Sequence, residues 1–458
     1  MKVRSLVPEP STAPAVAVRT FPYGFGSRFF ALLAGGFLLI VPAWIDPRLI
    51  VALVGWNLVV LAVWIFDLRR IPSGAALEVT RVWTSPLALG ASGRVKIEVS
   101  NHATLPIDAD VVDDVPAALR RDLPELALRV DASASGAGVY EILPAERGDA
   151  TLGRLWLRVR SPWAVAERWL AAAIDQTVRV FPDLDEARRQ SMFLLRSRQV
   201  TLEKRRVRVV GLGRDFESLR DYQPGDEARD ICWTATARRA KPVTKVYQPE
   251  RSQAVWVLVD AGRLLRARVG DRTKLDGMVN AALGLAEVAL AAGDRVGLLA
   301  YGRRIHARLA PDRGGPHLRI LVDALATLRA ERAEADHAGA VAALMTAQKR
   351  RALVVWLTDV AETAGVPDVI ESAARLSPEH VVVFGLTRPT ELTTIEDATP
   401  ATEDEMYRLL AVHETLDRRE VLLKGLRQRG VHVLEMDPAQ PTAMLIDQYL
   451  TVKERNLI

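Results

Sequence analysis

Two apolar runs near the N-terminus constrain this chain more than any other feature. Phe29 to Ile45 and Leu49 to Phe66 contain 17 and 18 residues, close to the minimum that crosses the hydrocarbon core of a bilayer. Only Asp46-Pro47-Arg48 separates them, a charged and helix-breaking link that favours a tight turn. Helices satisfy their own backbone hydrogen bonds, as a lipid environment requires. The pattern predicts a two-helix transmembrane hairpin over residues 29–70.

Cationic residues flank both outer ends of the predicted hairpin. Arg19 and Arg28 precede the first run, and Arg69 and Arg70 follow the second. Because Lys and Arg concentrate on the cytoplasmic side, we expect both termini and the soluble domains in the cytoplasm, with two spans in the inner (cytoplasmic) membrane. Residues 1–28 are then a cytoplasmic N-terminal tail. A cleaved signal peptide is disfavoured because a second span follows at once, and a hairpin buried in a soluble fold is the remaining alternative.

The positive charge of the chain belongs to these membrane flanks. The 458 residues carry a net charge of +5, and residues 1–70 hold seven cations against three acids, a balance of +4. The remaining residues therefore carry only +1, which is not the electrostatic footprint of a nucleic-acid-binding protein. The single cysteine, Cys232, excludes an intramolecular disulfide and a cysteine-based zinc site.

Residues 71–180 have the pattern of an antiparallel β module. Short segments that alternate apolar and polar residues, such as Arg94 to Ser100 and Leu155 to Arg160, are separated by turn-forming residues such as Asp113-Asp114. Period-2 alternation with frequent turns predicts a β-sandwich of immunoglobulin-like size. No group of residues in this segment indicates chemistry.

Residues 181–250 form a dense polar block. Acidic and basic residues alternate around Gln223-Pro224-Gly225-Asp226, which has the composition of a type II turn. Aromatic residues, including Tyr222 and Trp233, lie among them. The block lacks a nucleophile–base pair and metal-ligand spacing. It is typical either of a compact subdomain held by ion pairs or of a surface that docks a partner.

Residues 251–458 alternate apolar strands with helices. The predicted strands are Val255 to Asp260, Arg295 to Tyr301, Leu353 to Asp359, His380 to Leu386 and Val431 to Met436. The predicted helices are Lys274 to Ala292, His317 to Leu328, Ala338 to Lys349, Pro367 to Leu376 and Glu403 to Arg429. Near-continuous apolar strands between helices predict an α/β domain of Rossmann type with a parallel sheet covered on both faces.

Carboxylates follow two of the predicted strands. Asp260 and Asp359 end strands, Thr358 adjoins the second, and Asp336 precedes a helix. Open parallel sheets bind ligands beyond the carboxyl ends of their strands. We therefore expect these three aspartates at the ligand-binding edge of the sheet.

The polar block resembles the signature of a known family. Phe216 to Arg239, with Arg220-x-Tyr222-x-x-Gly225-Asp226 and Trp233-x-x-x-Ala237-Arg238, is similar to the family called domain of unknown function 58. The signature residues, which are candidates for partner docking, are Arg220, Tyr222, Gly225, Asp226, Arg229, Trp233, Ala237 and Arg238. The resemblance implies a von Willebrand factor A-like domain over residues 251–458 and a partner of the MoxR-type AAA+ ATPase class.

The resemblance also implies a particular kind of metal site. Von Willebrand factor A domains hold Mg²⁺ with an Asp-x-Ser-x-Ser loop, a threonine and an aspartate. Here the loop is Asp260 to Leu264, and Gly262 and Leu264 offer no side-chain oxygen where Mg²⁺ needs a near-octahedral oxygen set. Arg263 is a candidate for a neutralising cation. Intact metal binding, a degenerate structural site and an unrelated role all stay open.

Three functions fit the sequence. The first is a membrane-anchored, non-catalytic scaffold or adaptor that binds other proteins, with a MoxR-type ATPase as the implied partner and no cofactor unless Mg²⁺ binds the degenerate site. The second is a metal-dependent hydrolase that uses Asp260, Asp336 and Asp359. The third is nucleic-acid binding, which the near-neutral balance after residue 70 weakens.

Overall fold

The computed structural model describes residues 7–18, 22–38, 50–183, 215–223, 230–248, 253–360, 366–455 and 457. The chain divides into two compact units, Met1–Asp183 and Leu184–Ile458, and each is described by itself. The sequence-based boundaries within these units stay predictions.

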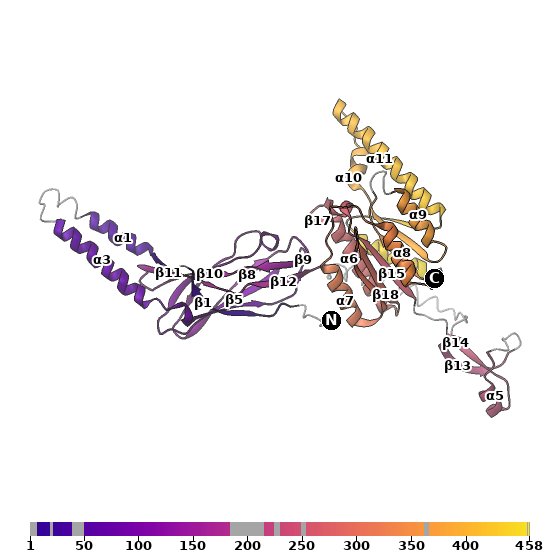
Figure 1. The fold of residues 1–458 in the computed structure, drawn as a ribbon, viewed down its shortest axis with the longest axis horizontal. Helices are drawn as coiled ribbons and strands as arrows, with labels where there is room; N and C mark the ends of the chain where they lie inside the picture. Colours follow the sequence, from indigo (N-terminus) through magenta and orange to yellow (C-terminus); the bar gives the residue numbers. More distant parts are fainter. Residues whose placement is uncertain are drawn as a thin grey trace. The chain divides into compact units, whose positions relative to one another are not determined.

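Unit 1 is built on antiparallel strands (Figure 1). They are β1 (Ser11–Ala17), β2 (Tyr23–Phe25), β3 (Leu77–Trp83), β4 (Leu87–Ala88), β5 (Gly93–Asn101), β6 (Ile107–Asp113), β7 (Glu125–Val130), β8 (Ala134–Ile142), β9 (Gly148–Leu152), β10 (Leu155–Arg160), β11 (Ala166–Ala172) and β12 (Gln176–Phe181). The main sheet has the order β7-β6-β10-β11-β1-β3-β5-β8, with β2 beside β11. A smaller sheet, β4-β12-β9, contains the one parallel pair among these described strands, β4 with β12.

Alternation of side chains gives unit 1 its core. Every second residue of β3, β5 and β6 is buried, and the apolar side chains among them meet in one cluster. The predicted antiparallel β module is therefore confirmed, whereas its immunoglobulin-like assignment stays a prediction. One expected turn is different: Asp113 is the last residue of β6, and its carboxylate is buried against Arg81.

The segment predicted as an N-terminal tail enters the sheet. The first residues of β1 pair with β3 and its last residues pair with β11, so this strand bridges two halves of the sheet. Ala15 lies in the core. Small, weakly apolar residues in this strand left the sequence without a clear strand signal, although they fill the space between the two flanking strands.

Two apolar helices lie side by side in unit 1 (Figure 1): α1 (Ser27–Phe37) and α3 (Ile50–Arg70). Trp56 Nε1 donates to the carbonyl of Leu32 at 2.9 Å, and Gly36 leaves room for the Trp56 ring. The 21 residues of α3 make it long and apolar enough to cross a membrane. The first predicted run continues to Ile45, but residues 39–49 lie outside the described part, so the second span and the orientation stay predictions.

Hydrogen bonds of Asp67 connect the C-terminal end of α3 to the sheet. Its fully buried carboxylate accepts hydrogen bonds from Ser161 Oγ at 2.6 Å, from Val165 N at 3.1 Å and from Ala166 N at 2.9 Å. Unpaired buried donors cost about 1–3 kcal/mol each. The position of this carboxylate therefore couples the helix to the start of β11.

Replacing Asp67 with alanine is expected to loosen this attachment. Because the hydroxyl and the two amides would be buried without an acceptor, local stability should fall by about 2 kcal/mol or more. Hydrogen exchange at Val165 and Ala166 measures the effect. The exposed Asp122 provides a matched control, and equal protection in Asp67→Ala and Asp122→Ala would contradict the attachment.

Unit 2 contains a six-stranded sheet. Its strands are β15 (Ala254–Asp260), β18 (Arg295–Tyr301), β19 (Ile305–Asp312), β20 (Leu353–Leu357), β21 (Val381–Thr387) and β22 (His432–Met436). The order is β19-β18-β15-β20-β21-β22, and all neighbours are parallel except β18 with β19. Counted along the chain this is 3-2-1-4-5-6, a doubly wound arrangement whose direction of winding reverses between β15 and β20.

Helices cover the sheet in two groups (Figure 1). The helices α6 (Lys274–Ala291), α7 (Gly314–Ala326) and α12 (Pro441–Glu454) form one group, and α8 (His337–Ala347), α9 (Val366–Leu376) and α11 (Glu403–Gln428) form the other. Every residue of β15 is buried, as two covered faces require. The predicted α/β domain with a parallel sheet is confirmed.

Several elements of unit 2 had no clear sequence signal. The edge strand β19 alternates between exposed and half-buried residues, so it lacks the apolar run of its neighbours. The short hairpin β16 (Arg268–Val269) and β17 (Arg272–Thr273), and the helices α10 (Thr390–Glu396) and α12, were also not predicted. Within the polar block, β13 (Asp215–Asp221) pairs with β14 (Val243–Gln248), and α5 (Trp233–Arg239) lies between them in sequence.

Candidate functional site

The carboxyl ends of β15 and β20 bring three predicted residues together. Asp260 accepts a hydrogen bond from Thr358 Oγ1 at 2.6 Å and one from Gly262 N at 2.6 Å, and its side chain is buried. Asp359 follows Thr358 directly and is equally buried. The neighbouring registers of β15 and β20 place these residues at the point where the winding reverses. We call Asp260, Thr358 and Asp359 the strand-end cluster.

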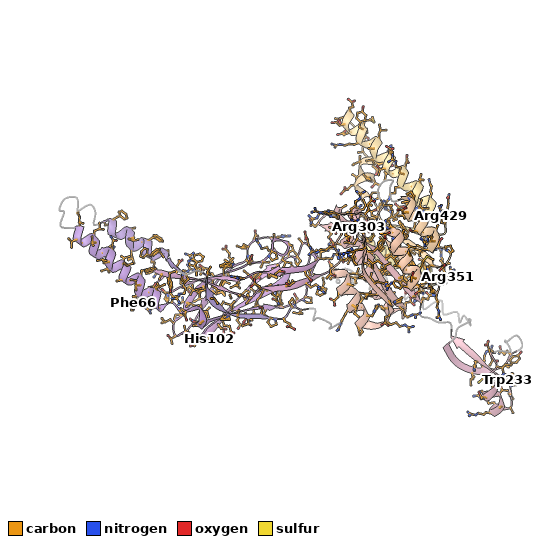
Figure 2. The ribbon with its side chains drawn as sticks, viewed as in Figure 1. Phe66, His102, Trp233, Arg303, Arg351 and Arg429 are labelled. Atoms are coloured by element: carbon orange, nitrogen blue, oxygen red, sulfur yellow. The ribbon has the colours of Figure 1, made fainter. Side chains whose placement is uncertain are left out.

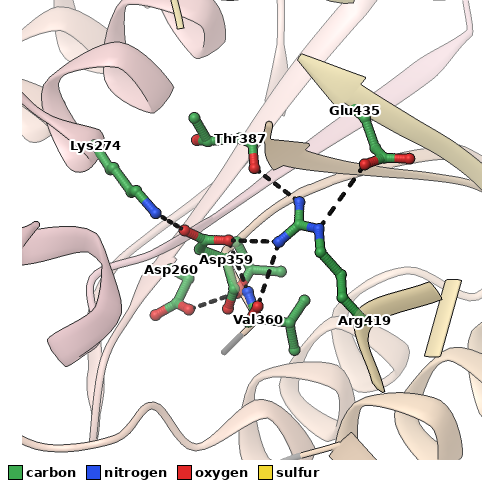
Figure 3. Close-up of polar contacts among 8 residues, drawn as sticks. Asp260, Lys274, Asp359, Val360, Thr387, Arg419 and Glu435 are labelled. Atoms are coloured by element: carbon green, nitrogen blue, oxygen red, sulfur yellow. Dashed lines mark hydrogen bonds and ion pairs between the residues drawn. The ribbon is translucent and has the colours of Figure 1, made fainter. Parts of the chain in front are cut away.

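The chain itself neutralises the strand-end cluster. Lys274 Nζ, from the first turn of α6, donates to Asp359 at 2.5 Å, and Arg419 Nη1, from α11, lies 3.5 Å from the same carboxylate (Figure 3). Arg419 also donates to the Thr387 carbonyl at 2.7 Å and pairs with Glu435 at 3.8 Å. Neither cation was predicted from the sequence.

Asp336 has a different role from the one expected. It is exposed, and its carboxylate accepts a hydrogen bond from Gly339 N at 2.8 Å, which caps the N-terminus of α8. A carboxylate in this position satisfies an amide that has no partner within the helix. Among the described residues, no group of three or more His, Cys, Asp or Glu side chains is placed to hold a metal ion.

The residues of the loop after β15 make contacts other than those of a metal-binding loop. A Cβ on Gly262 would lie 3.0 Å from both Asp260 Oδ1 and Ala335 N, so the loop is tightly packed there. Arg263 points to Glu334, at 2.8 Å, and both are exposed. The half-buried Leu264 brings no oxygen. Lys274 and Arg419, rather than the expected Arg263, neutralise Asp359.

A divalent cation does not fit this donor set. The Asp260 oxygens accept from a hydroxyl and an amide, and an ammonium and a guanidinium lie against Asp359. A metal ion would have to displace these donors and then find most of an octahedral shell elsewhere. Lys274 provides the positive charge that a cation would otherwise bring.

Calorimetric titration of the detergent-purified protein with Mg²⁺, Mn²⁺ or Ca²⁺ is therefore expected to show no saturable heat. The same titration of Asp359→Ala serves as the control for binding elsewhere. Saturable binding to the natural sequence that Asp359→Ala abolishes would show that a metal displaces Lys274.

A hydrogen-bonded chain of aromatic residues lies next to the cluster. Trp356 Nε1 donates to Tyr301 Oη at 2.6 Å, and the Tyr301 hydroxyl shares a hydrogen bond with His337 Nδ1 at 3.0 Å. Burial lowers the pKa of His337 below its usual value, and burial raises the pKa of Asp260. Burial thus favours the neutral form of the imidazole, which is held in place by its hydrogen bond with Tyr301.

The family-signature residues lie in the small β13–β14 region. Arg220 is in β13, Tyr222 follows it, and Trp233, Ala237 and Arg238 are in α5. Gly225, Asp226 and Arg229 lie outside the described residues. Trp233 is 69% exposed (Figure 2), and a large aromatic side chain in that state is typical of a surface that partners cover.

The fold and the site together define a class of protein. One unit is an α/β fold with a doubly wound sheet and the strand-end cluster, and the other is an antiparallel β unit with a helix that is long enough to span a membrane. Within that class, residues 218–399 match the family described as "Protein of unknown function DUF58". This match over residues 218–399 confirms the resemblance that the signature indicated. The matched segment begins in β13 and includes both carboxylates of the cluster and Lys274.

Curated relatives are similar over part of the chain. The uncharacterized protein Rv1480 of Mycobacterium tuberculosis and the uncharacterized protein Mb1516 of Mycobacterium bovis are each 28% identical over 153 residues, 33% of this chain and 48% of theirs. The uncharacterized protein YeaD of Bacillus subtilis is 42% identical over 43 residues, 9% of this chain and 11% of its own. The chain thus spans about half the length of the mycobacterial relatives it matches.

Among solved structures, the conserved hypothetical protein BatB from Bacteroides thetaiotaomicron aligns with 44% of this chain and all of its own, with a TM-score of 0.32 and 12% identity. A PapD-like domain of human CEP192 aligns with 20% of this chain and 75% of its own, with a TM-score of 0.16 and 12% identity.

Proposed function

We propose that this protein is a membrane-anchored, non-catalytic adaptor that binds other proteins through unit 2. One observation carries the proposal: at the ligand-binding edge of the sheet, Asp359 is already neutralised by Lys274 and Arg419, and Asp260 already accepts hydrogen bonds from the chain. Such a cluster has neither a free base nor an open metal position. It stabilises the loops that form the surface at this edge of the sheet.

A membrane hairpin is the second part of the proposal. Phe25 pairs with Ala166 just before α1, and Asp67 binds the Ala166 amide at the end of α3. The apolar segment therefore leaves and returns at the same edge of unit 1, which favours an even number of crossings. Val51 and Leu58 of α3 are 75% and 61% exposed, as expected for a face that contacts lipid. Both termini are then on one side, the cytoplasm by the flanking arginines.

The third part is the nature of unit 2 and of its partner. The 3-2-1-4-5-6 order with an antiparallel edge strand, and carboxylates at the reversal point, support a von Willebrand factor A-like fold. We infer a MoxR-type AAA+ ATPase as the partner, with the family-signature region as the docking surface. The exposed Trp233 and the cationic end of α5, with Arg238, are suited to that contact.

The hydrolase alternative is less well supported. A metal-dependent mechanism would need Asp260, Asp336 and Asp359 to converge with open oxygens, whereas Asp336 caps a helix and Asp359 holds two cations. Nucleic-acid binding is weakened by the near-neutral charge balance after residue 70.

The test is co-purification with a MoxR-type ATPase from the same genome after detergent extraction. We expect Trp233→Ala or Arg220→Ala to abolish co-purification. Trp156→Ala, at a half-exposed tryptophan of unit 1, is the matched control and should leave it unchanged. Co-purification that survives Trp233→Ala and Arg220→Ala would exclude this docking surface, and metal-stimulated turnover of ester or phosphate substrates would favour the hydrolase.

A further inference from the structure

A small cavity lies beside the strand-end cluster, between the start of α6 and the start of α12. Its volume is about 80 Å³, several times the roughly 10–15 Å³ that one water needs on this scale. The polar lining comes from Arg272, Thr273, Lys274, Asn280, Thr387 and Thr442, with Met278, Pro438 and Pro441 as apolar wall. The cavity holds a group of a few heavy atoms, much less than a nucleotide.

Asn280 gives the cavity an unused hydrogen-bond acceptor. Thr273, Gly277 and Asn280 recur at intervals of four and three residues, so they share one side of the start of α6. Asn280 is 4% exposed, and its Oδ1 is buried with no hydrogen-bond partner in the part of the chain that the structure describes. A buried acceptor left without a donor costs about 1–3 kcal/mol. A ligand that brings an N–H or O–H would remove this cost.

The rest of the lining favours a negative charge. Arg272 is cationic, whereas Asp359 already balances the charge of Lys274, and the N-terminus of the 14-residue α12 opens at the cavity through Pro441 and Thr442. The first amides of a helix have no partners inside it and attract anions. Gln440, the capping residue, makes no side-chain hydrogen bond to them. The ligand must therefore carry an anionic group and a hydrogen-bond donor close to each other.

We propose that this cavity binds the C-terminal carboxylate of a partner polypeptide. A terminal residue carries a carboxylate for Arg272 and the α12 amides, and its own N–H, two bonds from the carboxyl carbon, for Asn280 Oδ1. A sulfate dianion, or the dianion of a phosphate monoester, presents acceptors only and leaves Asn280 unsatisfied. The volume admits a small last residue, of alanine or glycine size. Chain-end capture of this kind uses backbone amides and a few side chains.

This proposal rests on the proposed adaptor function, because the ligand of the cavity is taken to be the chain end of a partner protein. It also connects the partner to the strand-end cluster, since Lys274 both lines the cavity and binds Asp359. The docking of an ATPase through Trp233 is a separate contact with a separate test. Loss of chain-end binding with ATPase co-purification intact would therefore overturn this inference alone.

The experiment titrates the full-length protein in detergent with three probes. They are N-acetyl-alanyl-alanine with a free carboxylate, the same dipeptide as its C-terminal amide, and acetate. Ligand-observed NMR or calorimetry gives the dissociation constants. We expect the free acid to bind at least tenfold more tightly than the amide or acetate, a difference of about 1.4 kcal/mol.

Variants assign the binding to the cavity. Arg272→Gln removes a cation from the lining of the cavity, and Asn280→Asp puts a negative charge in place of the buried acceptor. Each variant should therefore bind the dipeptide with the free carboxylate at least tenfold more weakly. Arg268→Gln is the matched control, because Arg268 lies in the same β16–β17 hairpin but does not line the cavity. Gly277→Leu fills the cavity from a helical position where an added Cβ meets only Pro441 Cγ, at 4.0 Å, so the fold is retained while binding is lost.

Three results would overturn the proposal. Equal binding of acid and amide would exclude recognition of the carboxylate. Equal binding of acetate and the dipeptide acid would make the cavity a site for free small carboxylates instead. Binding that survives both Arg272→Gln and Gly277→Leu would place the dipeptide elsewhere on the molecule.

Discussion

Arg81→Met is expected to destabilise unit 1 by about 3–5 kcal/mol, the cost of leaving one partner of a buried ion pair alone. Arg81 and Asp113 are 0% and 1% exposed. The guanidinium contacts Asp113 through both Nε and Nη2 and donates to the carbonyls of Ile174, at 2.9 Å, and Gly153, at 3.1 Å. Tyr140 Oη donates to Asp113 at 2.6 Å, and burial followed by the Asp113 charge raises the pKa of Tyr140 far above its usual range.

Hydrogen exchange of amides in β3 and β5 measures this loss for unit 1 alone, since unfolding of a chain with two units need not be two-state. Arg94→Met is the matched control: Arg94 and Glu141 form an exposed pair on a neighbouring strand, of a type that contributes about 0–1 kcal/mol. The double variant Arg81→Met/Asp113→Leu should recover part of the loss, because no charge remains buried. Similar exchange in the Arg81 and Arg94 variants would contradict a buried network.

Lys274→Met is expected to cost unit 2 about 2–3 kcal/mol. The value lies below the range for a fully broken buried pair, because the Lys274 side chain is 20% exposed and Arg419 remains 3.5 Å from Asp359. The loss should appear as faster exchange in the amides of β20 and the first turn of α6.

Lys349→Met, at an exposed lysine just after α8, is the matched control. Adding Asp359→Asn to Lys274→Met should restore stability, since the unpaired charge is then gone. A Lys274→Met protein as stable as the Lys349→Met protein would mean that Arg419 neutralises Asp359 alone, and the self-neutralised cluster would lose one of its two cations.

Much of the architecture of unit 2 could be predicted from the sequence, because buried parallel strands are continuous apolar runs and most of the helices that cover them have an apolar pattern. The predicted strand from Arg295 to Tyr301 has the observed bounds of β18. The edge strand β19 escaped because half of its residues face outward. In unit 1, the strand β1 was not predicted, because the predicted hairpin separates it in sequence from both strands with which it pairs.

The site was only partly predictable. Asp260, Thr358 and Asp359 were found because strand ends converge in a parallel sheet. Arg419 lies in the middle of a charged 26-residue helix, where nothing local distinguishes it from its neighbours. Asp336 caps a helix in the loop where the sequence placed a candidate ligand, and an aspartate before a helix is as readily a cap as a ligand.

The position of β1 has a consequence for biosynthesis. Ser11 pairs with Arg81 and Ala15 with Ala172, so this strand is made before the apolar helices and its partners are made after them. Until the ribosome has passed residue 172, β1 has an open edge and no complete sheet to join. Under the proposed membrane anchoring, the apolar segment is available for insertion before the sheet can be completed, and a delay in insertion would leave an aggregation-prone strand exposed.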